Sequence, residues 1–181
     1  MDYRTGRSTF TGLLRSSATI ILALSASTAA AAPVNPQYTV GVINDYALGR
    51  SILAQKYDKA IGKLAARETS GIKGFYIANN LCVAYLKSGQ LEAAQSVCDR
   101  AVTTIEAILE EHSARRSNSP KMLGYRKYLA VALSNRGVVF AVNGAPQLAR
   151  EDFVAALETQ AYVQIAENNL ARLDVDAAPA A

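Results

Sequence analysis

Apolar side chains in the middle of the chain recur at intervals of three and four, which is typical of a helix that buries one face. They occur at Ala94, Val97, Cys98, Ala101, Ile105, Ile108 and Leu109. This pattern predicts one helix that continues to about His112. The sequence "ARRSNSP" then interrupts it, and Ser119-Pro120 favours the start of another helix, because proline suits a first helical turn.

A second pattern is a spacing of small and aromatic residues that occurs twice. In "NNLCVAYLKSGQLEAAQSVCDRA", residues 79–101, it runs through Cys82, Tyr85, Gly89, Ala94, Cys98 and Ala101. The same intervals return at Gly137, Phe140, Gly144, Ala149, Phe153 and Ala156. Ala60 and Ala94 are separated by one period of about 34 residues, a length that marks a repeat architecture. In addition, "NNL" returns in "AENNLARL" near residue 170.

On these residues the chain resembles the tetratricopeptide repeat (TPR) family, whose repeat is a helix–turn–helix of about 34 residues. The resemblance implies an all-α fold: a right-handed superhelical stack of about three TPR hairpins with a C-terminal capping helix. Departures from the family pattern fall at Ser51, Arg67, Ala78 and Arg136. The expected boundaries are a TPR domain over 41–173, with repeats at about 41–74, 75–108 and 130–163, an extended hairpin over 103–129, a capping helix over 164–173 and a disordered tail over 174–181.

The spacing has a packing explanation. Small residues at Ala94 and Ala149 let the two helices of a hairpin approach to about 8–10 Å. Gly89 and Gly144 supply the left-handed backbone that ends a first helix. Pro146 stands where a second helix begins, a position that needs no amide hydrogen.

The extended hairpin interrupts the period, since the step from Ala94 to Ala149 is well over one repeat long. Its tip carries Arg115, Arg116 and Lys121. These side chains form either a solvated basic turn or a second contact site for an acidic partner.

Residues 1–31 have the parts of a secretory signal peptide: Arg4, Arg7 and Arg15, then the apolar run "ATIILAL", then "SASTAAAAP". We expect cleavage after Ala31, an extended linker over 32–40, and a periplasmic or secreted protein. The apolar run is shorter than the roughly 20 residues of a membrane span, so none is expected after cleavage. Of 19 basic and 15 acidic residues, 16 and 14 remain, a net charge of +2. This small charge gives no reason to expect nucleic-acid binding.

The sequence offers little for catalysis. His112 is the one histidine, and no glycine-rich phosphate loop or metal-ligand spacing accompanies it. Glu110 and Glu111 are adjacent, so they point to different faces of a helix and do not form an acid–base pair. We therefore expect a protein that is not an enzyme and has no cofactor or metal.

Cys82 and Cys98 are the two cysteines, and export would permit a disulfide. Counted from Gly89, one lies seven residues before and the other nine residues after. This leaves an axial mismatch of about 3 Å at the helical rise, so the bond is only marginally within reach. Two small buried thiols are the favoured interpretation.

The family resemblance also implies a concave groove lined by the first helix of each hairpin. Carried over by position, the groove residues are Asp45, Tyr46, Tyr76, Asn79, Asn80, Val83, Ser134, Asn135, Val138, Asn168 and Asn169. An asparagine both donates and accepts hydrogen bonds, so a row of them can hold the backbone of an extended peptide. The alternative is that these polar residues simply face solvent.

Together these features predict a non-catalytic interaction module that binds a peptide or protein surface in an asparagine-lined groove. The alternative is a structural, self-associating subunit of an envelope complex, in which Val83, Val138 and Ala141 are buried by a second copy.

Overall fold

The computed structural model describes residues 38–67, 69–113, 119–159 and 164–176, and within these ranges it is all-α. The expected signal peptide, the first part of the linker (32–37), Arg115 and Arg116, and the end of the tail (177–181) lie outside the described residues. The helices are α1 (Gly49–Leu53), α2 (Tyr57–Leu64), α3 (Gly71–Lys87), α4 (Leu91–Ser113), α5 (Pro120–Val142), α6 (Pro146–Glu158) and α7 (Gln164–Asp176).

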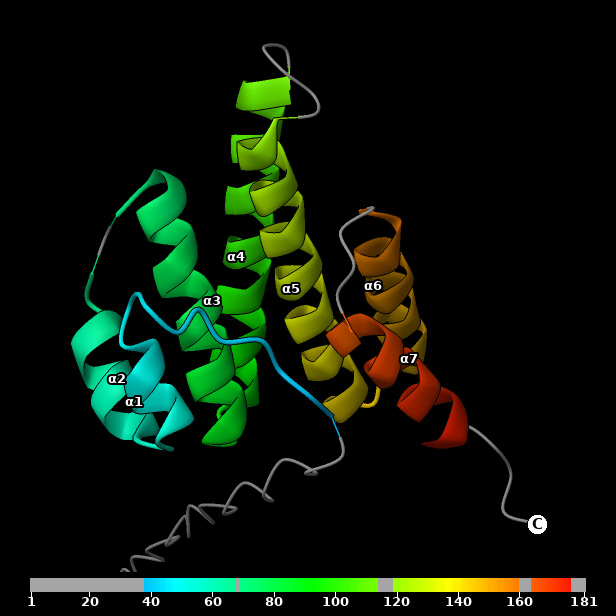
Figure 1. Cartoon of the computed structure of the whole chain (residues 1–181). Coiled ribbons are helices and arrows are strands. Elements are labelled where there is room, and N and C mark those ends of the chain that lie inside the picture. The colour runs from blue at the N-terminus through cyan, green and yellow to red at the C-terminus, as the bar shows by residue number, and fades with distance from the viewer. Residues whose placement is uncertain (1–37, 68, 114–118, 160–163, 177–181) are drawn as a thin grey trace, which may run out of the picture. The chain divides into compact units, whose positions relative to one another are not determined.

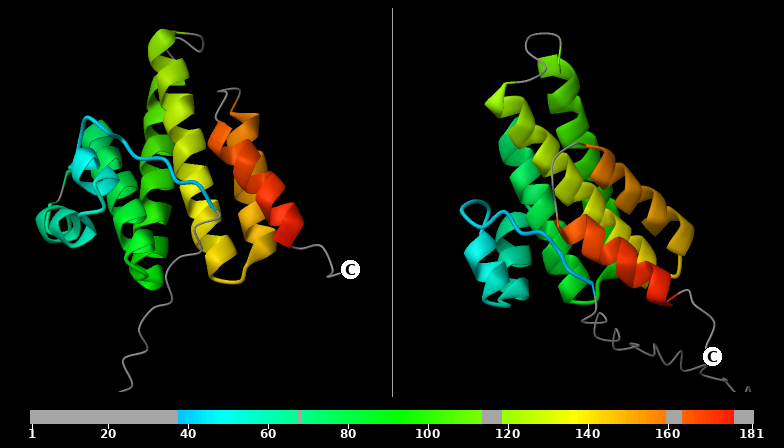
Figure 2. Two further views of the ribbon diagram at one scale, coloured as in Figure 1. Left: turned by 60° about the horizontal axis from the view of Figure 1, so that its bottom comes forward. Right: turned by 45° about the vertical axis from the view of Figure 1, so that its right-hand side comes forward.

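Successive helices pack as antiparallel neighbours. Helices α3 and α4 form one hairpin, α5 and α6 form the next, and α4 packs against α5 between them (Figure 1). At the two ends, α2 covers α3, while α7 lies against α5 and α6 (Figure 2). Helix α3 also contacts α5, and α5 contacts α7, so the first helix of each hairpin lies next to the corresponding helix of the following unit.

The turns follow the spacing in the sequence. Gly89 and Gly144 have φ values of 76° and 75°, a left-handed conformation that strains a residue with a side chain. Pro146 is the first residue of α6, as expected. Ala94 and Ala149 are fully buried, in line with close helix approach at both positions.

The long hairpin between α4 and α5 is also as expected. Helix α4 runs on to Ser113, and α5 begins at Pro120. Ser119 caps α5, because its hydroxyl accepts a hydrogen bond from the amide of Met122 at 3.2 Å.

The cysteines were predicted incorrectly. Cys82 and Cys98 form a disulfide between α3 and α4, and their Cα atoms lie 5.0 Å apart. This separation is within the usual disulfide range, because two small residues let the helices approach closely at this level of the hairpin. Both cysteines are buried.

The N-terminal part differs most from the expected repeat. In place of a first helix starting near residue 41, residues 38–43 run as an extended segment, and α1 has only five residues. Val40, Val42 and Ile43 are β-branched, which weakens a helix, and the backbone of this stretch is hydrogen-bonded elsewhere. In Figure 1 the segment (blue to cyan) crosses in front of α5 and α3.

Candidate functional site

Residues 38–43, here called the docked segment, cross one face of the helices, here called the inner face. The inner face carries the asparagines that the sequence singled out. Asn169 on α7 accepts from the amide of Thr39 at 2.9 Å and donates to its carbonyl at 2.8 Å. Asn135 on α5 does the same with Gly41, at 2.7 and 2.8 Å. Asn80 on α3 pairs likewise with Ile43, at 2.9 Å in both directions. Each side chain thus holds both polar groups of one backbone unit.

This match has a simple geometric origin. In an extended chain alternate residues point the same way, so Thr39, Gly41 and Ile43 present their backbone groups to one side. Asn80 and Asn135 each stand nine residues before the glycine that ends their helix, and Asn169 follows Asn135 by one repeat period. Equivalent points of neighbouring helices therefore meet alternate residues of one strand-like segment.

Further amide contacts connect the asparagines to one another. Asn79 donates to the carbonyl of Gly41 at 3.1 Å and accepts from Asn135 at 3.0 Å. Asn169 also donates to the hydroxyl of Ser134 at 3.1 Å. The four asparagines at positions 79, 80, 135 and 169 are at most 1% exposed. Such buried amides are favourable only when they are paired, and the docked segment supplies their partners.

The side chains of the docked segment are as closely fitted as its backbone. Tyr38 is 7% exposed, stacks on Phe153 and donates a hydrogen bond to Asp176 at 3.1 Å. Burial, followed by the contact with Asp176, raises the pKa of Tyr38 to about 12. At Gly41 an added Cβ would stand 2.5 Å from Cγ1 of Val131, so this position has no room for a side chain. The segment is thereby anchored by an aromatic ring and by one obligatory glycine.

The groove residues predicted from the sequence therefore fall into two sets. Seven are buried beneath or beside the docked segment: Asn79, Asn80, Val83, Ser134, Asn135, Val138 and Asn169. Four retain exposed surface: Asp45, Tyr46, Tyr76 and Asn168. The alternative that these polar residues simply face solvent is wrong for the asparagines of the first set, because this chain's own backbone occupies them.

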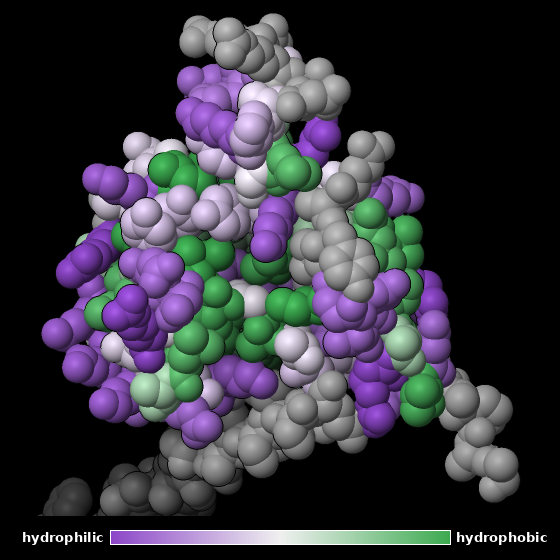
Figure 3. Space-filling model, viewed as in Figure 1, coloured by the Kyte–Doolittle hydropathy of each residue, from purple (hydrophilic) through white to green (hydrophobic). Residues whose placement is uncertain are grey.

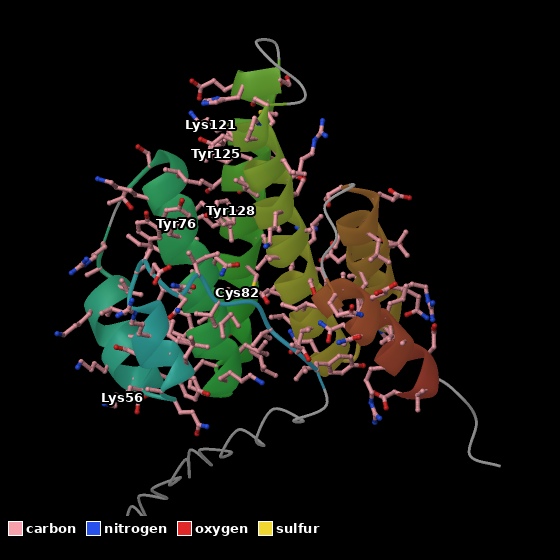
Figure 4. All side chains as sticks on the ribbon, viewed as in Figure 1. Lys56, Tyr76, Cys82, Lys121, Tyr125 and Tyr128 are labelled. Atoms are coloured by element: carbon pink, nitrogen blue, oxygen red, sulfur yellow. A yellow bond between two sulfur atoms is a disulfide. The ribbon has the colours of Figure 1, made fainter. Side chains whose placement is uncertain are left out.

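Beside the docked segment lies a group of four tyrosines, here called the tyrosine cluster: Tyr46, Tyr76, Tyr125 and Tyr128. The rings of Tyr46 and Tyr76 stack with centroids 4.5 Å apart, and Tyr128 meets Tyr76 edge-on at 5.5 Å. Figure 4 shows Tyr76 and Tyr128 at about the same height on the upper part of α3 and α5, with Tyr125 and then Lys121 above them. Burial and contact with Tyr128 raise the pKa of Tyr76, so its hydroxyl stays protonated.

The tyrosine cluster is open to solvent. Tyr46 is 55% exposed, and the other three rings are half-buried. In the space-filling view this part of the face carries pale residues of intermediate hydropathy above the hydrophobic middle (Figure 3). Phe75 lies beneath it, fully buried, with its ring 5.3 Å from that of Tyr128.

Of the predicted second contact, Lys121 lies within the described residues and adjoins this cluster. The ammonium group of Lys121 lies 5.5 Å from the centroid of the Tyr125 ring and 3.3 Å from Nε2 of His112. The His112 ring in turn meets Tyr125 edge-on at 5.5 Å. His112 thus takes part in an aromatic and polar contact at the end of α4.

Within the described ranges, the side chains offer no constellation for metal binding. No group of three or more His, Cys, Asp or Glu residues there is arranged to hold an ion. Over the same residues, no helix combines the length and apolar character that a bilayer crossing requires.

Comparison with known proteins adds no assignment. No family model, no curated protein and no solved structure matches the chain.

Two features of the site were missed in the sequence. The repeat spacing assigns residues 38–40 to a linker and 41–43 to a first helix, although the β-branched run "TVGVI" favours an extended chain. Tyr125 and Tyr128 were also overlooked, although they follow each other at a spacing of three on α5 and so share a helix face with each other.

Proposed function

We propose that the protein is an exported, non-catalytic interaction module of the TPR type that binds a protein partner through the tyrosine cluster. The TPR assignment rests on the repeated spacing of glycine, alanine and aromatic residues in hairpins α3/α4 and α5/α6. Contacts between α3, α5 and α7 agree with such a stack.

One observation carries the functional part of the proposal. The backbone-binding groups of the inner face are already satisfied by the docked segment, so a partner meets the surface that remains beside it. That surface holds Tyr46 and Tyr76 from the predicted groove and Tyr125 and Tyr128 from α5. The rings of Tyr46, Tyr76 and Tyr128 form one connected set of aromatic contacts. Tyr125 lies near enough to Tyr76 to affect its pKa.

Tyrosines are suited to this role for physical reasons. Each has a large, rigid, amphipathic side chain that loses little conformational entropy on binding, and tyrosine is enriched in interface hot spots. Here Tyr46, Tyr76 and Tyr128 pack against one another, and the buried Phe75 supports Tyr76 and Tyr128, so these rings are held in place before a partner arrives. Pre-organised contact groups lower the entropic cost of association. Lys121 adds a positive charge at the rim, next to Tyr125.

Export is supported by two independent features. The first residues have the order of charge, apolar run and small residues that a signal peptide requires. The disulfide between Cys82 and Cys98 is a bond that forms and persists in oxidising compartments. We place the mature protein in the periplasm or outside the cell.

The alternative role is self-association that buries Val83, Val138 and Ala141. The contacts of these side chains within one chain do not favour it. Val83 packs against Val40 and Val42 of the docked segment, and Val138 belongs to the core that includes Tyr38. Ala141 is partly buried against the same core. Val83 and Val138 are thus covered within one chain, and only Ala141 keeps part of its surface exposed.

The proposal is tested by site-specific photocrosslinking in the cells that naturally make the protein. A photoreactive residue at position 125 should give a discrete adduct with one protein. The matched control is position 123 on the same helix, because Leu123 is 55% exposed and points about 200° away from residue 125 around the helix. We expect no adduct from position 123.

The adduct protein is then purified and its affinity measured by calorimetry. Changing Tyr46 and Tyr128 together to alanine should weaken binding at least tenfold, since each is an aromatic contact at the centre of the surface. Equal adducts from positions 123 and 125, or unchanged affinity in a double variant with native helicity, would contradict the assignment.

A further inference from the structure

The docked segment is recognised by contacts that do not depend on its covalent link to the rest of the chain. Its six backbone bonds with Asn80, Asn135 and Asn169 are those that a separate peptide would make. The anchoring ring of Tyr38 and the close approach at Gly41 define which peptide fits. The inner face is therefore a peptide-binding site that the chain's own docked segment occupies.

The link between this ligand and the helices is strained. The connection, residues 44–48, is here called the hinge. Its last two residues, Ala47 and Leu48, have φ values of 46° and 57°, the left-handed region that residues with a side chain rarely adopt. Asn80 holds the hinge in this shape by donating to the carbonyls of Tyr46 and Ala47, at 2.9 and 3.2 Å. The first three hinge residues are exposed.

An extended hinge would remove this strain but would carry the docked segment away from its own inner face. The vacated face would lose these six hydrogen bonds and would expose the apolar side chains that Tyr38, Val40 and Val42 cover, which is costly. A second copy of the chain carries the one segment certain to fit, with a tyrosine and a glycine three residues apart. Mutual exchange satisfies both faces at once and closes as a two-fold dimer.

We propose that residues 38–43 of one copy bind the inner face of a second copy, and the reverse, to form a segment-exchanged dimer. The hydrogen bonds at Thr39, Gly41 and Ile43 are the same in both states, but in the dimer they join two chains. Strain at Ala47 and Leu48 favours exchange, whereas the high local concentration of the chain's own segment favours the closed monomer. The balance therefore depends on the hinge and on protein concentration.

The first test changes the hinge in protein purified from cells that express the full chain. Wild type and Ala47→Gly are unfolded in urea with the disulfide intact, refolded over a range of concentrations, and analysed by size-exclusion chromatography with light scattering. Glycine adopts positive φ without strain. With two hinges per dimer, we expect Ala47→Gly to lower the dimer association constant by roughly tenfold to a hundredfold.

The second test pairs two defective chains. Gly41→Val adds a side chain for which the inner face has no room, so this variant has a defective segment and an intact inner face. Asn135→Leu removes the amide that binds Gly41, so this variant has a defective inner face and an intact segment. Refolded together, the two should form a one-to-one complex that melts above either chain alone, even if each alone folds poorly. As a matched control, Gly62→Val, at a glycine with open space around its Cβ position, replaces Gly41→Val and should give no such complex.

Two outcomes would overturn the proposal. One is a mixture of the Gly41→Val and Asn135→Leu chains that behaves as the sum of its parts. The other is a wild-type chain that forms no more dimer than Ala47→Gly at any refolding concentration.

Discussion

The hairpins α3/α4 and α5/α6 repeat one backbone plan, in which residues of the second follow their counterparts in the first at a constant offset. The same offset relates Gly89 to Gly144, Ala94 to Ala149, and Asn80 to Asn135. What joins the two helices differs. In the first hairpin Cys82 and Cys98 form a disulfide; in the second, the equivalent residues are Gly137 and Phe153. A Cβ at Gly137 would stand 2.5 Å from the Phe153 ring, so the ring fills the space that the glycine leaves.

The positions one residue before these also differ: the first hairpin has an apolar pair there, and the second has a charged pair. Leu81 and Val97 are buried in the first hairpin, whereas Arg136 and Asp152 form two hydrogen bonds, at 2.7 and 2.8 Å, in the second. Burial raises the pKa of the Asp152 carboxyl, while Arg136 opposes that shift. Asp99 on α4 adds a second carboxylate at 3.3 Å from Arg136, so the charge links neighbouring hairpins. The same spacing therefore supports two hairpins whose helices are joined by quite different chemistry.

The largest expected effect comes from removing the ring that closes the second hairpin. Phe153 is fully buried, so Phe153→Ala should lower the free energy of unfolding by about 3–5 kcal/mol, measured by urea denaturation. Gly137→Leu in the same chain should recover part of this loss by refilling the space. A loss below about 1 kcal/mol would mean that the ring is not the main contact of this hairpin.

The covalent closure of the first hairpin should contribute somewhat less. Replacing Cys82 and Cys98 together by alanine opens a loop with a sequence separation of 16 and should cost about 3 kcal/mol. The wild-type chain should show no free thiol when denatured without a reductant. A reductant should destabilise the wild type but leave the double variant unchanged, and equal stability of the two proteins would argue against the bond.

The smallest effect is expected from converting the charged pair into the apolar one. Asp152→Val alone leaves the half-buried Arg136 with only the more exposed Asp99, which should cost about 1–3 kcal/mol. Adding Arg136→Leu reproduces Leu81 and Val97, and the double variant should be within about 1 kcal/mol of wild type or more stable. Equal stability of the single and double variants would show that Arg136 needs no buried partner.

Much of the helical framework was predictable because it depends on short-range spacing. The turns at Gly89 and Gly144, the end of α4 near His112, the start of α5 at Pro120 and the burial of Ala94 and Ala149 follow from local backbone and packing rules. The positions of the inner-face asparagines were also visible as equivalent points of a repeat. Arg136, which departs from the repeat pattern that the sequence resembles, could not be assigned a partner because Asp152 and Asp99 reach it only through packing.

By itself, then, the sequence determined helices α3 to α7, the pairing of α3 with α4 and of α5 with α6, and the row of amides, since each depends on intervals of a few residues. It did not determine the extended N-terminal segment. Only the tertiary structure decided what those amides hold. Asn135 and Gly41 are far apart in the sequence, and no local rule connects them. The disulfide was decided in the same way, because a small change in the distance between α3 and α4 determines whether the two cysteines can form a bond or remain free thiols. Contacts across the fold depend on how all the helices pack at once, and so the partner of each buried amide emerges only when the chain is folded.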